Sequence, residues 1–293
     1  MSESRLSAAR VLVPASGLLL FLQAALVVTG GAVRLTGSGL GCPTWPECTP
    51  GSYTPVPHQA EPQLNVWIEF ANRLLTFVLV LAAVIVIVAV LKSGRKDLRA
   101  LAIGQLLGIF AQGILGGITV LTDLNPIPVA GHLLLSMILI AGATSLHVRR
   151  FSPAIKIESS ILTRRVARAH VAITYLVLIL GTIVTGSGPH AGDAKAKRFD
   201  FDIRTVAILH ADVVIFLFGV TLAFYIAVGT TDVTKKKLRT FTIIALAQGT
   251  IGYVQYFTGV PALLVGAHLL GASILWISAW RVWLSVQQRM DKK

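Results

Sequence analysis

Eight apolar runs, each about 20 residues long, constrain the fold of this chain more than any other feature. At 1.5 Å per residue, a helix of about 20 residues crosses the roughly 30 Å hydrocarbon core of a bilayer. Hydrophobic residues make up 54% of the chain and charged residues 13%, with a mean hydropathy of +0.74. A water-soluble domain of 293 residues could not carry this composition on its surface. We therefore predict an all-α integral membrane protein with transmembrane helices at residues 13–34, 66–91, 98–121, 126–147, 166–186, 204–228, 239–258 and 261–284.

The 26 lysines and arginines alternate from loop to loop, and this pattern predicts the orientation. Twenty lie before the first span, between spans 2 and 3, 4 and 5, and 6 and 7, or after the last span. The other six lie on the opposite side: Arg34, Arg73, Lys195, Lys197, Arg198 and Arg204. The positive-inside rule then places both termini in the cytoplasm of a bacterial plasma membrane. Anionic lipid accounts for the net charge of +13, so we expect no nucleic-acid partner. The N-terminus lacks the cleavage site of a signal peptide, so we expect the first span to be retained.

An internal repeat divides the chain into two similar halves. The segment at 111–135 returns 136 positions later at 247–271 with nine of 25 residues identical, including His132 and His268. Four helices per half is an even number, so both halves enter the membrane in the same direction and the repeat is parallel. We expect two four-helix bundles, one at 1–150 and one at 151–293.

Both cysteines, Cys42 and Cys48, lie in the longest external loop, at 35–65. Two cysteines in one short loop on the oxidising side favour a disulfide over two free thiols. A metal site is less attractive, because His58 is the only histidine nearby in that loop. The spacing does not decide whether the bond is structural or redox-active.

Spans 2, 4, 6 and 8 all run from outside to inside, so equal counts along them mean equal depths. His132, His210 and His268 each lie six or seven residues below the outer end, about 10 Å into the membrane. Asn72 takes this place in span 2. An ionisable side chain at such a depth is costly, and imidazole is a good ligand for haem iron. His210 and His268 therefore form a candidate bis-histidine haem site, although a helix-to-helix hydrogen bond is the alternative for any single histidine.

The first half offers a different set of side chains. His132 faces Asn72, which is not a normal iron ligand, so a haem there would have an open or weak sixth position. Glu69 lies three residues before Asn72, on the same helix face, and is a candidate catalytic carboxylate. Arg73 would either pair with Glu69 or bind a haem propionate. The remaining histidines are weaker signals: we expect His147 and His170 to be solvated or lipid-facing, and His190 to lie in an external loop.

The chain resembles the haem A synthase family over nearly its whole length. The resemblance rests on GGAVRLTGSGLGCPTWPECTP at 30–50, on IEFANRL at 68–74, and on the histidines of spans 4, 6 and 8. It implies an oxidoreductase that acts on a CH3 group, converting the C8 methyl of haem O through an alcohol to the formyl group of haem A. Oxygen derived from water and a role in cytochrome oxidase biogenesis are also implied.

The resemblance also implies a role for each candidate residue. His210 and His268 would ligate a haem b cofactor, while haem O would bind near His132 and Glu69. Many members carry a histidine where this chain has Asn72, so a bis-histidine substrate site is not carried over. Cys42 and Cys48 match the form of the family with a cysteine pair, in which a disulfide contributes to activity. Haem O synthase and cytochrome oxidase assembly factors are candidate partners, and association into a homo-oligomer is left open.

Two other classes of protein compete with this interpretation. An electron-transfer cytochrome b subunit would also hold haem between transmembrane histidines, but usually needs ligand pairs near both faces. A transporter built on an internal repeat would place its polar site at the midplane, whereas these residues lie near the outer face.

Overall fold

The computed structural model describes the whole chain except residues 1–2, 58, 152–153, 157–158, 228–229 and 291–293. Eight long helices follow one another: α1 (Glu3–Leu35), α2 (Gln63–Lys92), α3 (Arg99–Leu121), α4 (Pro126–Arg149), α5 (Ile161–Ser187), α6 (Ile203–Ile226), α7 (Asp232–Phe257) and α8 (Ala262–Gln287). A short 3-10 helix, η1 (Lys96–Leu98), precedes α3. The expected eight helices are therefore present, at nearly the expected positions.

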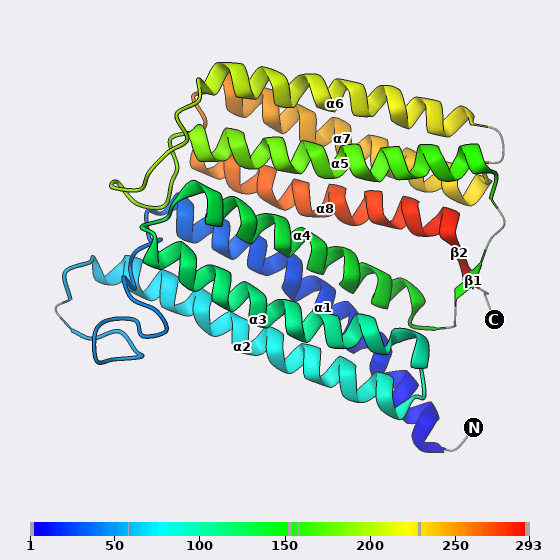
Figure 1. The fold of residues 1–293 in the computed structure, drawn as a ribbon, viewed down its shortest axis with the longest axis horizontal. Helices are drawn as coiled ribbons and strands as arrows, with labels where there is room; N and C mark the ends of the chain where they lie inside the picture. Colours follow the sequence, from blue (N-terminus) through cyan, green and yellow to red (C-terminus); the bar gives the residue numbers. More distant parts are fainter. Residues whose placement is uncertain (1–2, 58, 152–153, 157–158, 228–229, 291–293) are drawn as a thin grey trace.

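Two short strands are an addition to the expected all-helical fold. β1 (Ala154–Lys156) lies in the linker between α4 and α5, and β2 (Gln288–Met290) directly follows α8. They pair in antiparallel fashion, which joins the linker to the C-terminal end of the chain (Figure 1). The start of α1 lies at this same end of the bundle.

Polar side chains fix where several helices begin. Asn125 caps α4 by accepting from Ile127 N, and Pro126 follows at the first helical position. Ser160, Asp202 and Thr231 accept from the backbone three residues ahead in α5, α6 and α7. The bonds from Thr205 hold the pKa of the Asp202 carboxyl below its usual range.

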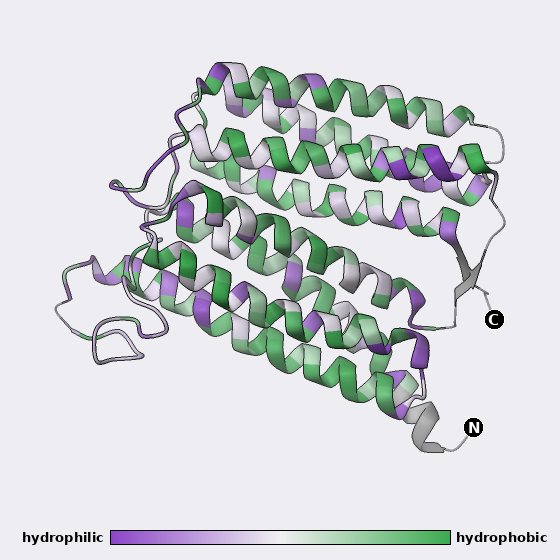
Figure 2. Ribbon diagram, viewed as in Figure 1, coloured by the Kyte–Doolittle hydropathy of each residue, from purple (hydrophilic) through white to green (hydrophobic). Residues whose placement is uncertain are grey.

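Apolar side chains cover the outside of the bundle as well as its core. Hydrophobic residues follow the helix shafts and hydrophilic residues gather at the ends and in the loops (Figure 2). Phe77, Phe257 and Leu263 are each more than 70% exposed, as side chains that face lipid would be. Among the described residues, seven helices are long and apolar enough to cross a membrane. The exception is α7, which carries three consecutive lysines near its start and two glutamines, Gln248 and Gln255, further along.

The two halves pack against each other through α1, α4, α5 and α8. Trp276 Nε1 of α8 donates to the carbonyl of Met137 in α4 at 2.6 Å, and Trp280 Nε1 donates to Ser145 Oγ at 2.7 Å. One apolar core cluster includes Met137 and Ile140 together with residues of α5 to α8. The boundary predicted near residue 150 thus falls in a linker, while the core runs across it.

The tight turns of the two halves share one backbone feature. Asp123 and Leu124 between α3 and α4 have positive φ, and so do Gly259 and Val260 between α7 and α8. Each pair lies 136 positions from the other, which is the spacing of the sequence repeat.

The parallel arrangement of the halves, and the cytoplasmic placement of both termini, stay predictions.

Candidate functional site

A cavity of about 530 Å³ lies in the first half, among α1, α2, α3 and α4. Glu69, Asn72, Arg73 and His132 all line it, so four of the predicted site residues come together in one space. Trp45 of the external cysteine loop forms part of its wall. Ala191 and Gly192 of the loop between α5 and α6 also line it, so the second half helps to enclose this cavity.

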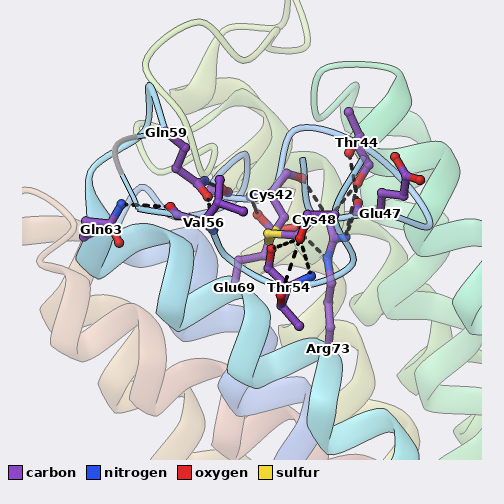
Figure 3. Close-up of a disulfide and its surroundings, with 12 residues drawn as sticks. Cys42, Thr44, Glu47, Cys48, Thr54, Val56, Gln59, Gln63, Glu69 and Arg73 are labelled. Carbon is purple, nitrogen blue, oxygen red and sulfur yellow. Dashed lines mark hydrogen bonds and ion pairs between the residues drawn. A yellow bond between two sulfur atoms is a disulfide. The ribbon is translucent and has the colours of Figure 1, made fainter. Parts of the chain in front are cut away.

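Glu69 is 5% exposed, and both of its carboxylate oxygens have partners. Arg73 donates to Oε1 through Nη2 at 2.6 Å and through Nε at 3.1 Å. The backbone N–H of Cys42 donates to Oε2 at 2.7 Å (Figure 3). Of the two partners considered for Arg73, the structure shows the ion pair with Glu69. The carboxylate is therefore held in one orientation at the cavity wall.

Arg73 also holds the external loop in place. Its guanidinium donates to the carbonyls of Cys42, Thr44 and Glu47 at 2.8 to 3.2 Å (Figure 3). Guanidinium carries five N–H donors in a rigid fork, so one side chain can serve several acceptors. The cysteine loop is thereby fixed to the helix that carries Glu69.

The two cysteines form the predicted disulfide, Cys42–Cys48, with Cα atoms 4.3 Å apart. Both are fully buried beside Val66 of α2. Between them, Trp45 lies directly on Gly117 of α3, where a β-carbon would come within 2.5 Å of the indole. The loop thus places an aromatic ring over the outer part of the cavity.

His132 and Asn72 are both anchored by neighbouring helices. Gln112 Nε2 donates to the carbonyl of His132 at 3.0 Å, and Gly116 leaves room for the imidazole ring. Thr29 Oγ1 of α1 donates to Asn72 Oδ1 at 2.7 Å.

His210 and His268 lie in the second half and do not line this cavity, although Leu269, next to His268, does. Each has a buried Nδ1 that takes part in no hydrogen bond between described residues. Gly181 and Gly252 take the place of side chains that would crowd these rings. Free imidazole nitrogens beside glycines fit a haem held by two histidines. No group of three or more His, Cys, Asp or Glu suited to a bare metal ion occurs in the described part of the chain.

The match to a known family decides what kind of protein this is. A family model described as cytochrome oxidase assembly protein, COX15-CtaA, matches residues 16–280. The chain belongs to the COX15-CtaA family.

Several proteins similar to this chain are named heme A synthase. The protein from Azorhizobium caulinodans is 27% identical over 87% of this chain and 88% of its own length. The protein from Rickettsia canadensis is 26% identical over 86% of this chain and 90% of its own length. A shorter match, 30% identical over 34% of this chain and 30% of the relative, is to the protein from Geobacillus thermodenitrificans.

Among the histidines outside the site, His170 differs from the expectation. His170 is 1% exposed and packs between the rings of Phe224 and Phe241, so the prediction of a solvated or lipid-facing residue is wrong. α5, α6 and α7 meet closely at this point and enclose the imidazole. His147 is half-buried, with Nδ1 3.3 Å from Ser16 Oγ. His58 lies outside the described residues.

Three residues of the candidate site carried no functional prediction. Thr29 orients Asn72, and Trp45 covers the cavity. Arg34 lines the cavity from α1 and donates to the carbonyls of Thr185 and His190 in the second half. Gln112 and Gln248 occupy equivalent positions in the internal repeat and donate to the carbonyls of His132 and His268. Nothing local in the sequence marks Thr29, since its importance depends on which side of α1 faces α2.

Proposed function

We propose that this chain is a haem A synthase, which oxidises the C8 methyl group of haem O to the formyl group of haem A through an alcohol. The observation that carries the proposal is the family match over residues 16–280. The cavity supports it by gathering His132 and Glu69 in a space enclosed by helices. A membrane cytochrome b electron-transfer subunit is the alternative, and the relatives named heme A synthase disfavour it.

In the proposed reaction, His132 holds the iron of haem O and the methyl group is directed towards Glu69. Water supplies the oxygen atom. Each of the two steps removes two electrons and two protons from the substrate, and the electrons pass to an external oxidant. Glu69 is the carboxylate in the cavity that can accept a proton or stabilise positive charge. Arg73 and the Cys42 N–H keep that carboxylate in place throughout.

We also propose haem b as the resident cofactor, with His210 and His268 as its axial ligands. When bound, such a haem supplies one-electron transfer. Gln248 positions His268 by donating to its carbonyl at 2.7 Å. Replacing His210 or His268 by alanine should lower the haem b content of the purified protein. Unchanged optical spectra in both variants would show that the ligand assignment is wrong.

The proposed setting is a bacterial plasma membrane with both termini in the cytoplasm. The loop distribution of lysine and arginine supports this orientation. A green fluorescent protein fused to the C-terminus should then fluoresce, because it folds in the cytoplasm. We propose haem O synthase and cytochrome oxidase assembly factors as protein partners, and membrane lipid as the surroundings.

The direct test is to express the chain in cells that make haem O but no haem A. Haems extracted from these cells should then include haem A, identified by chromatography and mass. Cells that carry an empty vector are the control. A cell extract with haem O alone, despite a folded protein that binds haem b, would refute the proposed reaction.

A further inference from the structure

Asn72 offers the cavity a hydrogen-bond donor rather than a ligand for iron. Its amide oxygen accepts from Thr29 Oγ1 at 2.7 Å. The hydrogen bonds between described residues give its NH2 group no partner, and the side chain lines the cavity with His132. The group left for a bound molecule is therefore the amide N–H, which has no lone pair to coordinate a metal.

The same depth in the second half is arranged differently. There His210 lies against Gly181, which leaves room for an imidazole ring. In the first half the neighbouring helix supplies the Thr29 hydroxyl, which fixes the direction of a carboxamide. The surroundings of His210 thus leave space for a ring, whereas those of Asn72 orient a carboxamide. This difference argues that the Asn72 amide has a specific role in the cavity.

We propose that Asn72, oriented by Thr29, donates a hydrogen bond to a small molecule in the open sixth position of the substrate haem. This inference rests on the proposed function, because it needs a haem whose iron is held by His132. The iron of the substrate haem would then have one protein ligand, His132. On its opposite face, a polar pocket beside Asn72 would hold water or a diatomic molecule. The bis-histidine haem of the second half has no such position.

Carbon monoxide is the probe, added to reduced protein purified with haem O bound. The wild-type protein should bind it at one of its two haems. Asn72→His should supply a second ligand and abolish binding. Asn72→Leu should still bind carbon monoxide, but the C–O stretching frequency should rise because the N–H donor is gone. Thr29→Val should shift the frequency in the same direction. Thr250→Val should not, because among the described residues the Thr250 hydroxyl bonds only to a carbonyl of its own helix.

Two results would overturn this inference. One is a wild-type protein that contains haem O but binds no carbon monoxide. The other is an unchanged C–O frequency in Asn72→Leu, with normal haem b absorbance as the check on folding. If the wild-type protein still produced haem A in either case, the proposed function would stand and only the role of Asn72 would be refuted. Failure of the inference can therefore be distinguished from failure of the proposed function.

A second candidate binding site lies at the opposite end of the molecule. A groove of about 470 Å³ runs between α6 and α7, with Phe218, Leu222 and Ile243 among its apolar lining. Tyr225 and Arg239 line it as well, and Arg239 donates to Tyr225 Oη through Nε at 3.0 Å and Nη2 at 2.6 Å. The groove therefore combines an apolar channel with a cationic group.

The cations here have no neutralising partner in the described part of the chain. Lys235 Nζ lies 5.7 Å from the Tyr225 ring, and Lys236 and Lys237 follow it. None of these residues, nor Arg239, forms an ion pair within the described residues, although Asp232 begins the same helix. We infer that the groove binds an anionic phospholipid, with the phosphate at Arg239 and Lys235 and an acyl chain along the apolar lining.

The test compares phosphatidylglycerol with phosphatidylcholine added to protein in mild detergent. Phosphatidylglycerol should raise the Tm more than phosphatidylcholine, and the difference should disappear in Arg239→Gln/Lys235→Gln. The control is Lys92→Gln/Arg99→Gln, which removes two exposed cations at the same end but outside the groove. The inference would be overturned if the two lipids raised the Tm of the wild-type protein equally. It would also be overturned if Arg239→Gln/Lys235→Gln kept the difference in Tm, or if both double variants lost it equally.

Discussion

Both carboxylate oxygens of Glu69 are bonded, and this decides which substitution can test its role. Glutamine keeps an oxygen that can accept from the Cys42 N–H, but it removes the negative charge beside Arg73. Alanine would in addition remove the oxygen that accepts from the Cys42 N–H, so a loss of activity could then reflect a displaced loop. The glutamine variant separates the chemical role from the structural one.

Glu69→Gln should reduce haem A production by about 100-fold or more, the range typical of a lost acid–base group. Bound haem b should stay near the wild-type amount, because His210 and His268 lie in the other half. Extracted haems measure the first quantity and the optical spectrum the second. Glu47→Gln is the matched control, since its carboxylate accepts from Gly51 N in the same loop and bonds to no other described residue. Haem A production within a few-fold of wild type would mean that no carboxylate is required.

Single residues also show where sequence reasoning stopped. Common depth and helix spacing placed Glu69, Asn72, Arg73 and His132 near one another, and all four line one cavity, while their roles stay predictions. The hydroxyl of Thr29 could not be assigned, because a bond between α1 and α2 depends on the rotation of each helix about its axis. His170 was misjudged for the same reason: its distance from the helix end was known, but not the rings that enclose it.

The helices themselves were readily predicted, since a bilayer requires apolar runs of a set length. Their ends were less certain. α7 begins at Asp232, whereas the apolar run begins near residue 239, because the charged first turns continue the helix beyond the hydrophobic span. The conformation of the external loop could not be predicted, because no local sequence pattern shows that Trp45 packs on α3.

The contact between Trp45 and Gly117 makes α3 part of the cavity roof. Gly117→Ala should push the indole away, because the added β-carbon would lie 2.5 Å from it. We expect a several-fold loss of bound haem O and a shift in tryptophan fluorescence, with haem b unchanged. The matched control is Gly104→Ala on the same helix, where a β-carbon meets nothing within 4 Å. That change should stabilise the helix by up to about 1 kcal/mol. Equal haem O retention in the two variants would show that Trp45 does not close the cavity.

At the scale of the whole molecule, the two halves are not independent domains. The loop between α5 and α6 reaches over the cavity of the first half, where Gly39 N donates to the carbonyl of Gly192 at 2.9 Å. His190 Nε2 donates to the carbonyl of Val260, in the turn between α7 and α8, at 2.8 Å. The second half therefore contributes a cover to the proposed substrate site in addition to its own proposed haem site.

Arg34 is the side chain that fastens this cover to the first half. It donates to the carbonyls of Thr185 and His190, each a bond from a charged donor worth about 1.5 to 3 kcal/mol. Lysine in this position has the charge but not the fork, so Arg34→Lys should lose at least one of these bonds. A loss of about 1.4 kcal/mol corresponds to roughly tenfold faster opening, so amide hydrogen exchange in residues 188–202 should accelerate by that factor. Lys195→Arg, an exposed change in the same loop, should leave the exchange rates as they are. If Arg34→Lys leaves them unchanged as well, the cover is held by the packing of Leu124 against Ala191 and Ala196 rather than by the guanidinium.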